Sequence, residues 1–324
     1  MLRLRLAISA VVALAATGPA AAEWQAVLIP AAGVAAVVQD GDAALVLAGN
    51  AWHRFDPVSF RLQPAQAPKQ SASPPGALPD ARVASGREIV DRAWLSEPTQ
   101  RYRHGVLGDA IEAGSLTIVR RDGSQAVLRL PPDSVFEDIE PRVARIGGRE
   151  RIVLVRAYLD RGAAIALIDP ASATIIAESP PIGHANAWRN PAGIADYDGD
   201  GATDIAVVRQ PHVLGRLELW SFIGGTLTKT AEVADTSNHV IGSRALGLSA
   251  TADFDRDGQP DLAVPSLDRR SLRLIAFSPS ARDIAHVAMP ARIATDFATV
   301  QRQGRPAILL GLENGQLVLV HERQ

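Results

Sequence analysis

The chain of 324 residues contains no cysteine. The fold therefore uses no disulfide bond, and the protein has neither a thiolate metal site nor a cysteine nucleophile. Lysine is nearly absent as well, because only Lys69 and Lys229 are lysines among 33 basic residues. The chain also has 35 acidic residues, so its net charge is −2. A nucleic-acid binder usually carries a clustered basic surface, so we expect no nucleic-acid partner.

Aromatic residues make up only 5% of the chain, so its core must pack mainly through Val, Ile, Leu and Ala. Common catalytic signatures are absent too. The sequence has no H-E-x-x-H, no G-x-S-x-G and no glycine loop for phosphate. These absences favour a protein without enzymatic activity.

Residues 1–22 have the layout of a secretory signal peptide. Arg3 and Arg5 precede an apolar stretch over residues 6–17, and small residues follow at 20–22. The apolar stretch is too short to cross a bilayer, which takes about 20 residues. We expect cleavage after residue 22 and no membrane span afterwards; an uncleaved N-terminal anchor is the alternative. Export without cysteine fits a bacterial periplasm or secretion from a bacterium.

A repeat occupies the second half of the chain. Residues 195–207 read ADYDGDGATDIAV and residues 252–264 read ADFDRDGQPDLAV, with eight identities in 13 positions at an offset of 57. Each motif is followed by short alternating segments with turn residues between them, which indicates four short strands per unit. Fainter copies and hairpin patterns extend the repeat, at 33–49, 114–130, 141–176 and 291–322.

Equivalent strand positions recur along the whole chain and give six units, namely Leu45, Val106, Ile152, Ile205, Leu262 and Ile308. Four strands per unit of about 40–60 residues predict an all-β propeller. Six blades are favoured, with seven as the alternative. The last unit lacks a fourth strand, and WQAVLI at 24–29 can supply it and close the ring. We expect one domain over 23–324, with a long Pro/Ala/Ser-rich loop at 63–80.

Both motifs follow the pattern D-x-D-x-D-G-x-x-D. Oxygen ligands at alternate positions can wrap a calcium ion, which accepts six to eight of them. Gly201 and Gly258 stand where the loop needs a turn with positive φ. We expect two Ca²⁺ sites, each with four aspartates and the carbonyl of position 7. The first has Asp196, Asp198, Asp200, Ala202 and Asp204, and the second has Asp253, Asp255, Asp257, Gln259 and Asp261.

Two other interpretations of these loops are weaker. An EF-hand requires a glutamate at position 12 and flanking helices, whereas Val207 and Val264 stand there and the flanks alternate like strands. Acidic β-turns are common, but carboxylates packed this closely repel one another unless a cation or protons neutralise them. No ligand position is evidently open, so the expected role of the metal is structural.

The two motifs resemble FG-GAP/VCBS repeats, which occur in the propeller of integrin α subunits and in many exported bacterial proteins. The resemblance implies a propeller whose calcium loops link the first two strands of a blade. The corresponding segments at 145–150 and 298–304 lack the carboxylates, so we expect no metal there.

Two histidine–arginine pairs precede the loops, His184 with Arg189 and His239 with Arg244. Such a pair can grip a carboxylate or phosphate, and Trp188 lies beside Arg189. These residues are candidates for ligand binding; the alternative is that they only hydrogen-bond to backbone. The sequence thus favours an exported, calcium-stabilised module that binds a protein or glycan partner. The alternative is a hydrolase or lyase on polysaccharide or phosphoester with its site in the propeller channel.

Overall fold

The computed structural model describes residues 23–323, apart from 70 and 71. In this part of the chain the regular elements are strands, β1 to β24. A search of the same residues for a helix able to cross a membrane found none. The expected signal peptide, residues 1–22, lies outside the described residues.

Four antiparallel sheets contain four strands each. The first pairs in chain order and contains β2 (Val34–Asp40), β3 (Ala43–Ala48), β4 (Ala51–Asp56) and β5 (Arg61–Pro64). The next contains β14 (Arg189–Ala195), β15 (Asp204–Arg209), β16 (Arg216–Ile223) and β17 (Thr226–Val233). The third contains β18 (Ala250–Ala252), β19 (Asp261–Pro265), β20 (Ser271–Ala276) and β21 (Arg282–Ala288). The last contains β22 (Ala298–Arg302), β23 (Arg305–Gly311), β24 (Leu317–Glu322) and β1 (Trp24–Ile29).

The remaining strands form one sheet of eight rather than two separate sheets of four. Its strands are β6 (Val90–Thr99), β7 (Glu112–Arg120), β8 (Gln125–Arg129), β9 (Ser134–Phe136), β10 (Arg142–Ile146), β11 (Arg149–Tyr158), β12 (Gly162–Asp169) and β13 (Thr174–Glu178). The short β9 joins the two halves because it pairs with β11 on one side and, through Phe136 and Ala113, with β7 on the other. The half built on β6 gains a further edge from isolated bridges of Ala77 and Ala84.

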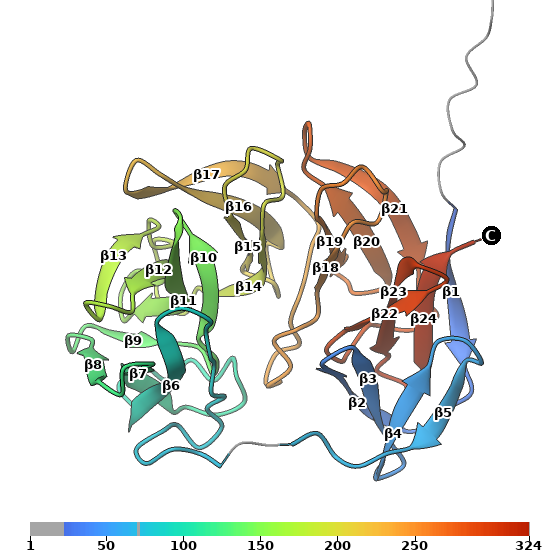
Figure 1. Ribbon diagram of the computed structural model, residues 1–324, viewed down its shortest axis with the longest axis horizontal. Coiled ribbons are helices and arrows are strands. Elements are labelled where there is room, and N and C mark those ends of the chain that lie inside the picture. The colour runs from blue at the N-terminus through green and yellow to red at the C-terminus, as the bar shows by residue number, and fades with distance from the viewer. Residues whose placement is uncertain (1–22, 70–71, 324) are drawn as a thin grey trace, which may run out of the picture.

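The sheets stand around a common centre, which confirms the all-β propeller (Figure 1). Among the described residues, four separate sheets and the two halves of the eight-stranded one are consistent with six blades. The ring is closed as predicted, since β1 pairs antiparallel with β24 and places Trp24 opposite Glu322. Pairing the two ends of the chain covers a sheet edge that would otherwise be exposed.

One expected strand position is wrong. Val106 lies in the connection between β6 and β7, and the strand that corresponds to β11 or β15 in its unit is β6. Val106 is apolar because it packs in a buried cluster with Leu107 and Trp188, so its hydrophobicity reflects core packing and not strand alternation. The hairpins expected at 33–49 and 114–130 are present as β2–β3 and β7–β8.

The core lies between neighbouring sheets and consists mainly of aliphatic side chains, as the low aromatic content requires. Central strands are buried on both faces; in β12 all seven residues from Gly162 to Ile168 are buried. Successive antiparallel strands put alternate connections at opposite ends of a sheet. The β14–β15 and β18–β19 loops therefore lie at one end of their sheets, and the β15–β16 and β17–β18 connections lie at the other.

Candidate metal loops and the central cluster

Both aspartate loops connect the first two strands of a sheet, β14 to β15 and β18 to β19. In the first loop, Asp196, Asp198 and Asp204 each offer a carboxylate oxygen within 4.8 Å of the others. The second loop forms an equivalent group from Asp253, Asp255 and Asp261. The fold thus brings together three of the four predicted carboxylates in each loop.

The same backbone-to-carboxylate hydrogen bonds hold the two loops. In the first loop the amide of Gly201 donates to Asp196 Oδ2 at 3.0 Å, and that of Ala202 donates to Asp200 Oδ1 at 2.7 Å. In the second loop the corresponding bonds run from Gly258 to Asp253 at 3.1 Å and from Gln259 to Asp257 at 2.8 Å. Asp200 and Asp257 therefore brace the turn from outside the three-carboxylate groups.

Positive backbone angles curl each loop at the predicted positions. Gly201 has φ +85° and Gly258 has φ +90°, in the left-handed region that glycine adopts without steric cost. Two residues earlier the backbone is left-handed again, at Gly199 with φ +79° and at Arg256 with φ 66°. Because an arginine takes up this conformation in the second loop, the shape belongs to the motif and not to glycine alone.

The last aspartate of each motif is its buried member. Asp204 Oδ2 accepts a hydrogen bond from the Tyr197 amide at 3.1 Å, and its Oδ1 accepts one from the Ser221 hydroxyl. Burial raises the pKa of Asp204 to about 6, and burial raises the pKa of Asp261 to about 7. The other carboxylates of each loop act in the same direction, so both loops hold negative charge that a divalent cation would stabilise.

An unpaired oxygen in the second loop indicates that these residues fit a cation. Asp253 Oδ1 is buried and has no hydrogen-bond partner. A buried acceptor without a partner is costly, and it belongs to the same carboxylate group as Asp255 and Asp261. The donor set is all oxygen, which suits calcium. The residues present therefore fit the ion, which Asp196, Asp198 and Asp204 would hold in the first loop.

The two loops differ in the cations around them. In the second loop Arg282 lies 2.5 Å from Asp255 Oδ2. Among the residues that the structure describes, no salt bridge involves Asp196, Asp198 or Asp204. Within the described residues, no guanidinium thus pairs with the carboxylates of the first loop, whereas Asp255 Oδ2 of the second loop pairs with Arg282.

An aromatic side chain at position 2 anchors each loop to the next sheet. Tyr197 is fully buried and its hydroxyl lies 2.7 Å from Thr251 Oγ1 in β18. Phe254 packs edge-on against Trp24 of β1, with ring centroids 5.6 Å apart. Each aspartate loop and its contact with the next sheet are therefore one structural unit, which the aspartate pattern alone did not reveal.

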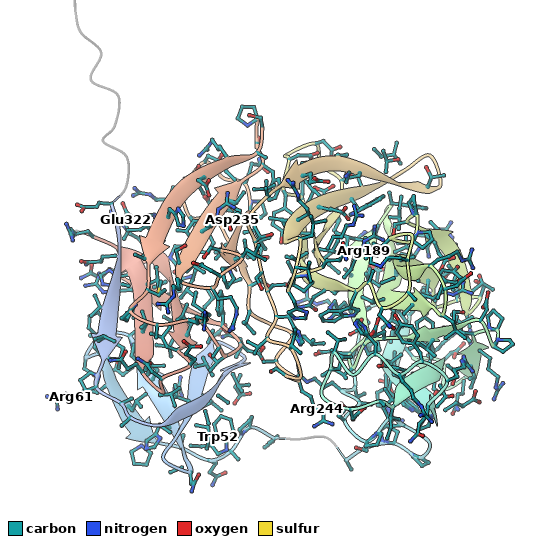
Figure 2. The ribbon with its side chains drawn as sticks, turned by 180° about the vertical axis from the view of Figure 1, so that it is seen from behind. Trp52, Arg61, Arg189, Asp235, Arg244 and Glu322 are labelled. Atoms are coloured by element: carbon teal, nitrogen blue, oxygen red, sulfur yellow. The ribbon has the colours of Figure 1, made fainter. Side chains whose placement is uncertain are left out.

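The arginines proposed for ligand binding make structural contacts. Arg189 is buried, and its Nη1 donates to Ser179 Oγ at 2.8 Å and to backbone carbonyls. Its Nε lies 3.4 Å from Glu218 Oε2. Arg244 lies on the β17–β18 connection, residues 234–249, and pairs with Asp80 and Asp109 at 2.7 Å each. Figure 2 shows Arg189 between sheets and Arg244 where this connection reaches toward the opposite side of the ring.

The other three candidates, His184, Trp188 and His239, all lie at one end of the sheets. Trp188 is buried and its Nε1 donates to the carbonyl of Glu137 at 3.0 Å. His184 is exposed and lies 3.2 Å from the carbonyl of Ala185. The buried His239 contacts Trp188 edge-on, at 4.8 Å between ring centroids. A ligand role for these residues stays a prediction.

Sequence reasoning missed His212, whose ring lies against that of His239. His212 Nε2 lies 2.9 Å from His239 Nδ1, and its ring stacks on Trp188. The two histidines line a cavity of about 350 Å³ formed by four connections between strands. They stand on separate connections and share no motif, so no local pattern could have joined them.

Sheets and loops together define a β-propeller with aspartate-rich loops between the first two strands of two blades. The family model described as "FG-GAP-like repeat" matches residues 180–264, which include both loops. This match agrees with the resemblance seen in the sequence. A search of curated proteins found no match.

Three solved structures illustrate the comparison with known folds. BamB from Moraxella catarrhalis has a TM-score of 0.37 at 11% identity, covering 88% of this chain and 71% of that one. A chain of the Mitotic Checkpoint Complex has a TM-score of 0.43 at 11% identity, covering 90% and 75%. A chain of BBS1N in complex with ARL6DN has a TM-score of 0.41 at 12% identity, covering 91% and 95%. The propeller assignment depends on the sheets described above.

Proposed function

We propose that this protein is an exported, calcium-stabilised β-propeller that serves as a non-catalytic binding module for a protein or glycan partner. The observation that supports calcium binding is that the same arrangement of carboxylates occurs in both loops. Two loops at equivalent places gather three carboxylates each, with matching backbone hydrogen bonds. The match of residues 180–264 to FG-GAP-like repeats supports the same conclusion.

Calcium bound in these loops would stabilise the fold by linkage. The unfolded chain does not hold the carboxylates together, so binding free energy becomes folding free energy. Each site contributes about 2.7 kcal/mol when free calcium is 100 times its dissociation constant. Because Tyr197 and Phe254 anchor the loops to the next sheets, this stabilisation reaches the contacts between blades.

Calorimetry of the purified mature chain tests the proposal. We expect two tightly bound calcium ions per chain by elemental analysis. A chelator should lower the melting temperature by roughly 10 °C for the two sites together, and added calcium should restore it. Asp160→Asn, at a side chain 75% exposed and remote from both loops, is the matched control and should behave as wild type. A melting curve that a chelator leaves in place would refute the calcium role.

The export and binding parts have their own experiments. Residues 1–22 support export, which fractionation of cells expressing the full chain tests. Capture of a specific glycan or protein by the calcium-loaded chain tests binding. The alternative, an enzyme with its site in the channel, has less support because Arg189 and Arg244 are engaged in structural pairs. Turnover of a polysaccharide or phosphoester that disappears in His239→Ala would favour it.

A further inference from the structure

The cavity beside His212 and His239 lies at the end of the sheets opposite the metal loops. It is formed by the connections β15–β16, β17–β18, β19–β20 and β21–β22. Its volume of about 350 Å³ is within the range of small-ligand sites, about 300–1,000 Å³. None of the aspartates in the metal loops lines it.

Two arginines give the cavity positive charge. Arg269 uses Nη1 to donate to the carbonyl of Ile293 at 2.6 Å, which leaves most of the five N–H groups of a guanidinium for another partner. Arg292 is half-exposed, and the nearest carboxylate, that of Glu313, is 3.7 Å away. Asp268 is the one acidic residue in the lining, and it accepts hydrogen bonds from the Ser266 hydroxyl and from the backbone amide of Arg270.

The histidine pair presents a hydrogen-bond acceptor. The carbonyl of Ser243 can only accept, so His239 Nε2, 2.9 Å away, carries a proton. A neutral His239 then accepts at Nδ1 from His212 Nε2–H, and a neutral His212 keeps a lone pair on Nδ1. Burial lowers the pKa of His212 to about 3 and that of His239 to about 4, and the charge of Arg269 acts in the same direction. Both rings are therefore neutral near pH 7.

Apolar side chains complete the lining. Val240, Ile241 and Leu267 face the cavity together with the charged and polar groups. Ile241 is 68% exposed, so its side chain is accessible to a molecule bound in the cavity. The cavity thus combines two cations, a neutral acceptor and an apolar wall.

We propose that this cavity binds a carboxylate that carries a neighbouring hydroxyl group, the chemistry of a sugar acid. The carboxylate pairs with Arg269 and Arg292, as guanidinium groups recognise carboxylates. The hydroxyl donates to His212 Nδ1, and the apolar wall covers the C–H face of the ligand. The inference depends on the proposed binding role and narrows it to acidic ligands. A free hydroxy acid and a uronic acid residue of a glycan share this chemistry.

Titration calorimetry on the calcium-saturated chain tests the ligand chemistry with matched probes. D-Glucuronate should bind at least about tenfold more tightly than D-glucose, because glucose lacks the charge that the arginines recognise. Lactate should bind about threefold to tenfold more tightly than propionate, the effect of one added hydrogen bond. A glucuronate-containing oligosaccharide that binds more tightly than glucuronate identifies a glycan; equal or weaker binding identifies a free acid.

Variants locate the site. Arg292→Gln should weaken glucuronate binding about tenfold. Arg270 follows Arg269 in the chain but does not line the cavity, so Arg270→Gln should leave binding unchanged. His212→Phe keeps a ring beside Trp188 and should bring the lactate and propionate affinities together. Equal binding of glucuronate and glucose, or no binding of any probe, overturns the proposal. In that case an intact calcium response of the melting curve would leave the calcium-stabilised propeller standing.

Discussion

The hydroxyl of Tyr197, in the first aspartate loop, lies 2.7 Å from Thr251 Oγ1 in the first strand of the next sheet. The Tyr197 ring is fully buried and packs against Phe277, which directly follows β20 of that sheet, at 5.7 Å between centroids. The loop therefore gathers its carboxylates on one side, and on the other side Tyr197 fixes it to the neighbouring blade.

Tyr197→Phe should lower the free energy of unfolding by about 0.5–1.5 kcal/mol, because one hydrogen bond between sheets is lost while the ring remains. Calcium stoichiometry should not change. Denaturant unfolding of Tyr197→Phe, Thr251→Val and the double variant measures the coupling. Fully additive effects would show that the two hydroxyl groups do not interact.

Asp198→Asn and Asp255→Asn should each reduce bound calcium from two ions to one. An asparagine keeps the Oδ1 acceptor for the amides of Asp200 and Asp257 but removes the charge that holds a hard cation. Elemental analysis after gel filtration gives the count. Two retained ions in either variant would contradict the assignment of that loop.

Arg282→Gln should raise calcium affinity at the second loop by roughly twofold to fivefold. The Arg282 guanidinium pairs with Asp255 Oδ2 and so competes with the ion; the gain is modest because the arginine is 44% exposed. Titration in the Asp198→Asn background isolates the second site. Arg161→Gln, at a similarly exposed arginine away from both loops, is the control, and an affinity lowered by Arg282→Gln would refute competition.

Arg189→Met should destabilise the protein by about 3 kcal/mol, because it leaves the buried carboxylate of Glu218 without its closest cation. Arg209 and Lys229, at 3.8 and 3.9 Å from Glu218, limit the loss. Arg244→Met, at an exposed side chain, should cost about 1 kcal/mol or less. Thermal unfolding of both variants distinguishes them, and a loss of about 1 kcal/mol or less in Arg189→Met would contradict a structural role for Arg189.

The contribution of Glu112 to stability should fall as pH rises above about 5. Both of its carboxyl oxygens are buried without partners, and it lies next to the β7–β9 contact made by Ala113 and Phe136, close to Glu137. Burial, followed by the charges of Glu137 and other carboxylates, raises the pKa of Glu112 to about 10 from 4.5. Glu137 also contacts His104 at 2.5 Å, and burial lowers the pKa of that histidine.

The folded state therefore keeps on Glu112 a proton that the unfolded state releases over this range, so the contribution of Glu112 to stability is greatest below pH 4.5 and declines by up to about 1.4 kcal/mol per pH unit. Glu112→Gln should remove this contribution, so the stability of wild type relative to the variant falls as pH rises. Denaturant unfolding at pH 5–9 in saturating calcium measures the difference, with Glu97→Gln at an exposed site as control. Parallel curves for wild type and Glu112→Gln would contradict the raised pKa.

Local patterns predicted the parts of the fold that depend on neighbouring residues. Alternating apolar residues predicted the β2–β3 and β7–β8 hairpins, since a half-buried strand requires that period. The missing fourth strand of the last unit predicted the pairing of β1 with β24. The prediction that Val106 lies in a strand was wrong, because a buried apolar residue in a connection gives the same local signal as a strand.

The sequence by itself determined the propeller and the two aspartate loops, because strand alternation and alternate carboxylates act over a few consecutive residues. Only the tertiary structure decided that β9 joins two blades, that Tyr197 bonds to Thr251, and that His212 meets His239 beside Arg269. These contacts join residues from different blades or connections. Their positions depend on how the sheets pack around the ring, and spacing along the chain does not record that packing.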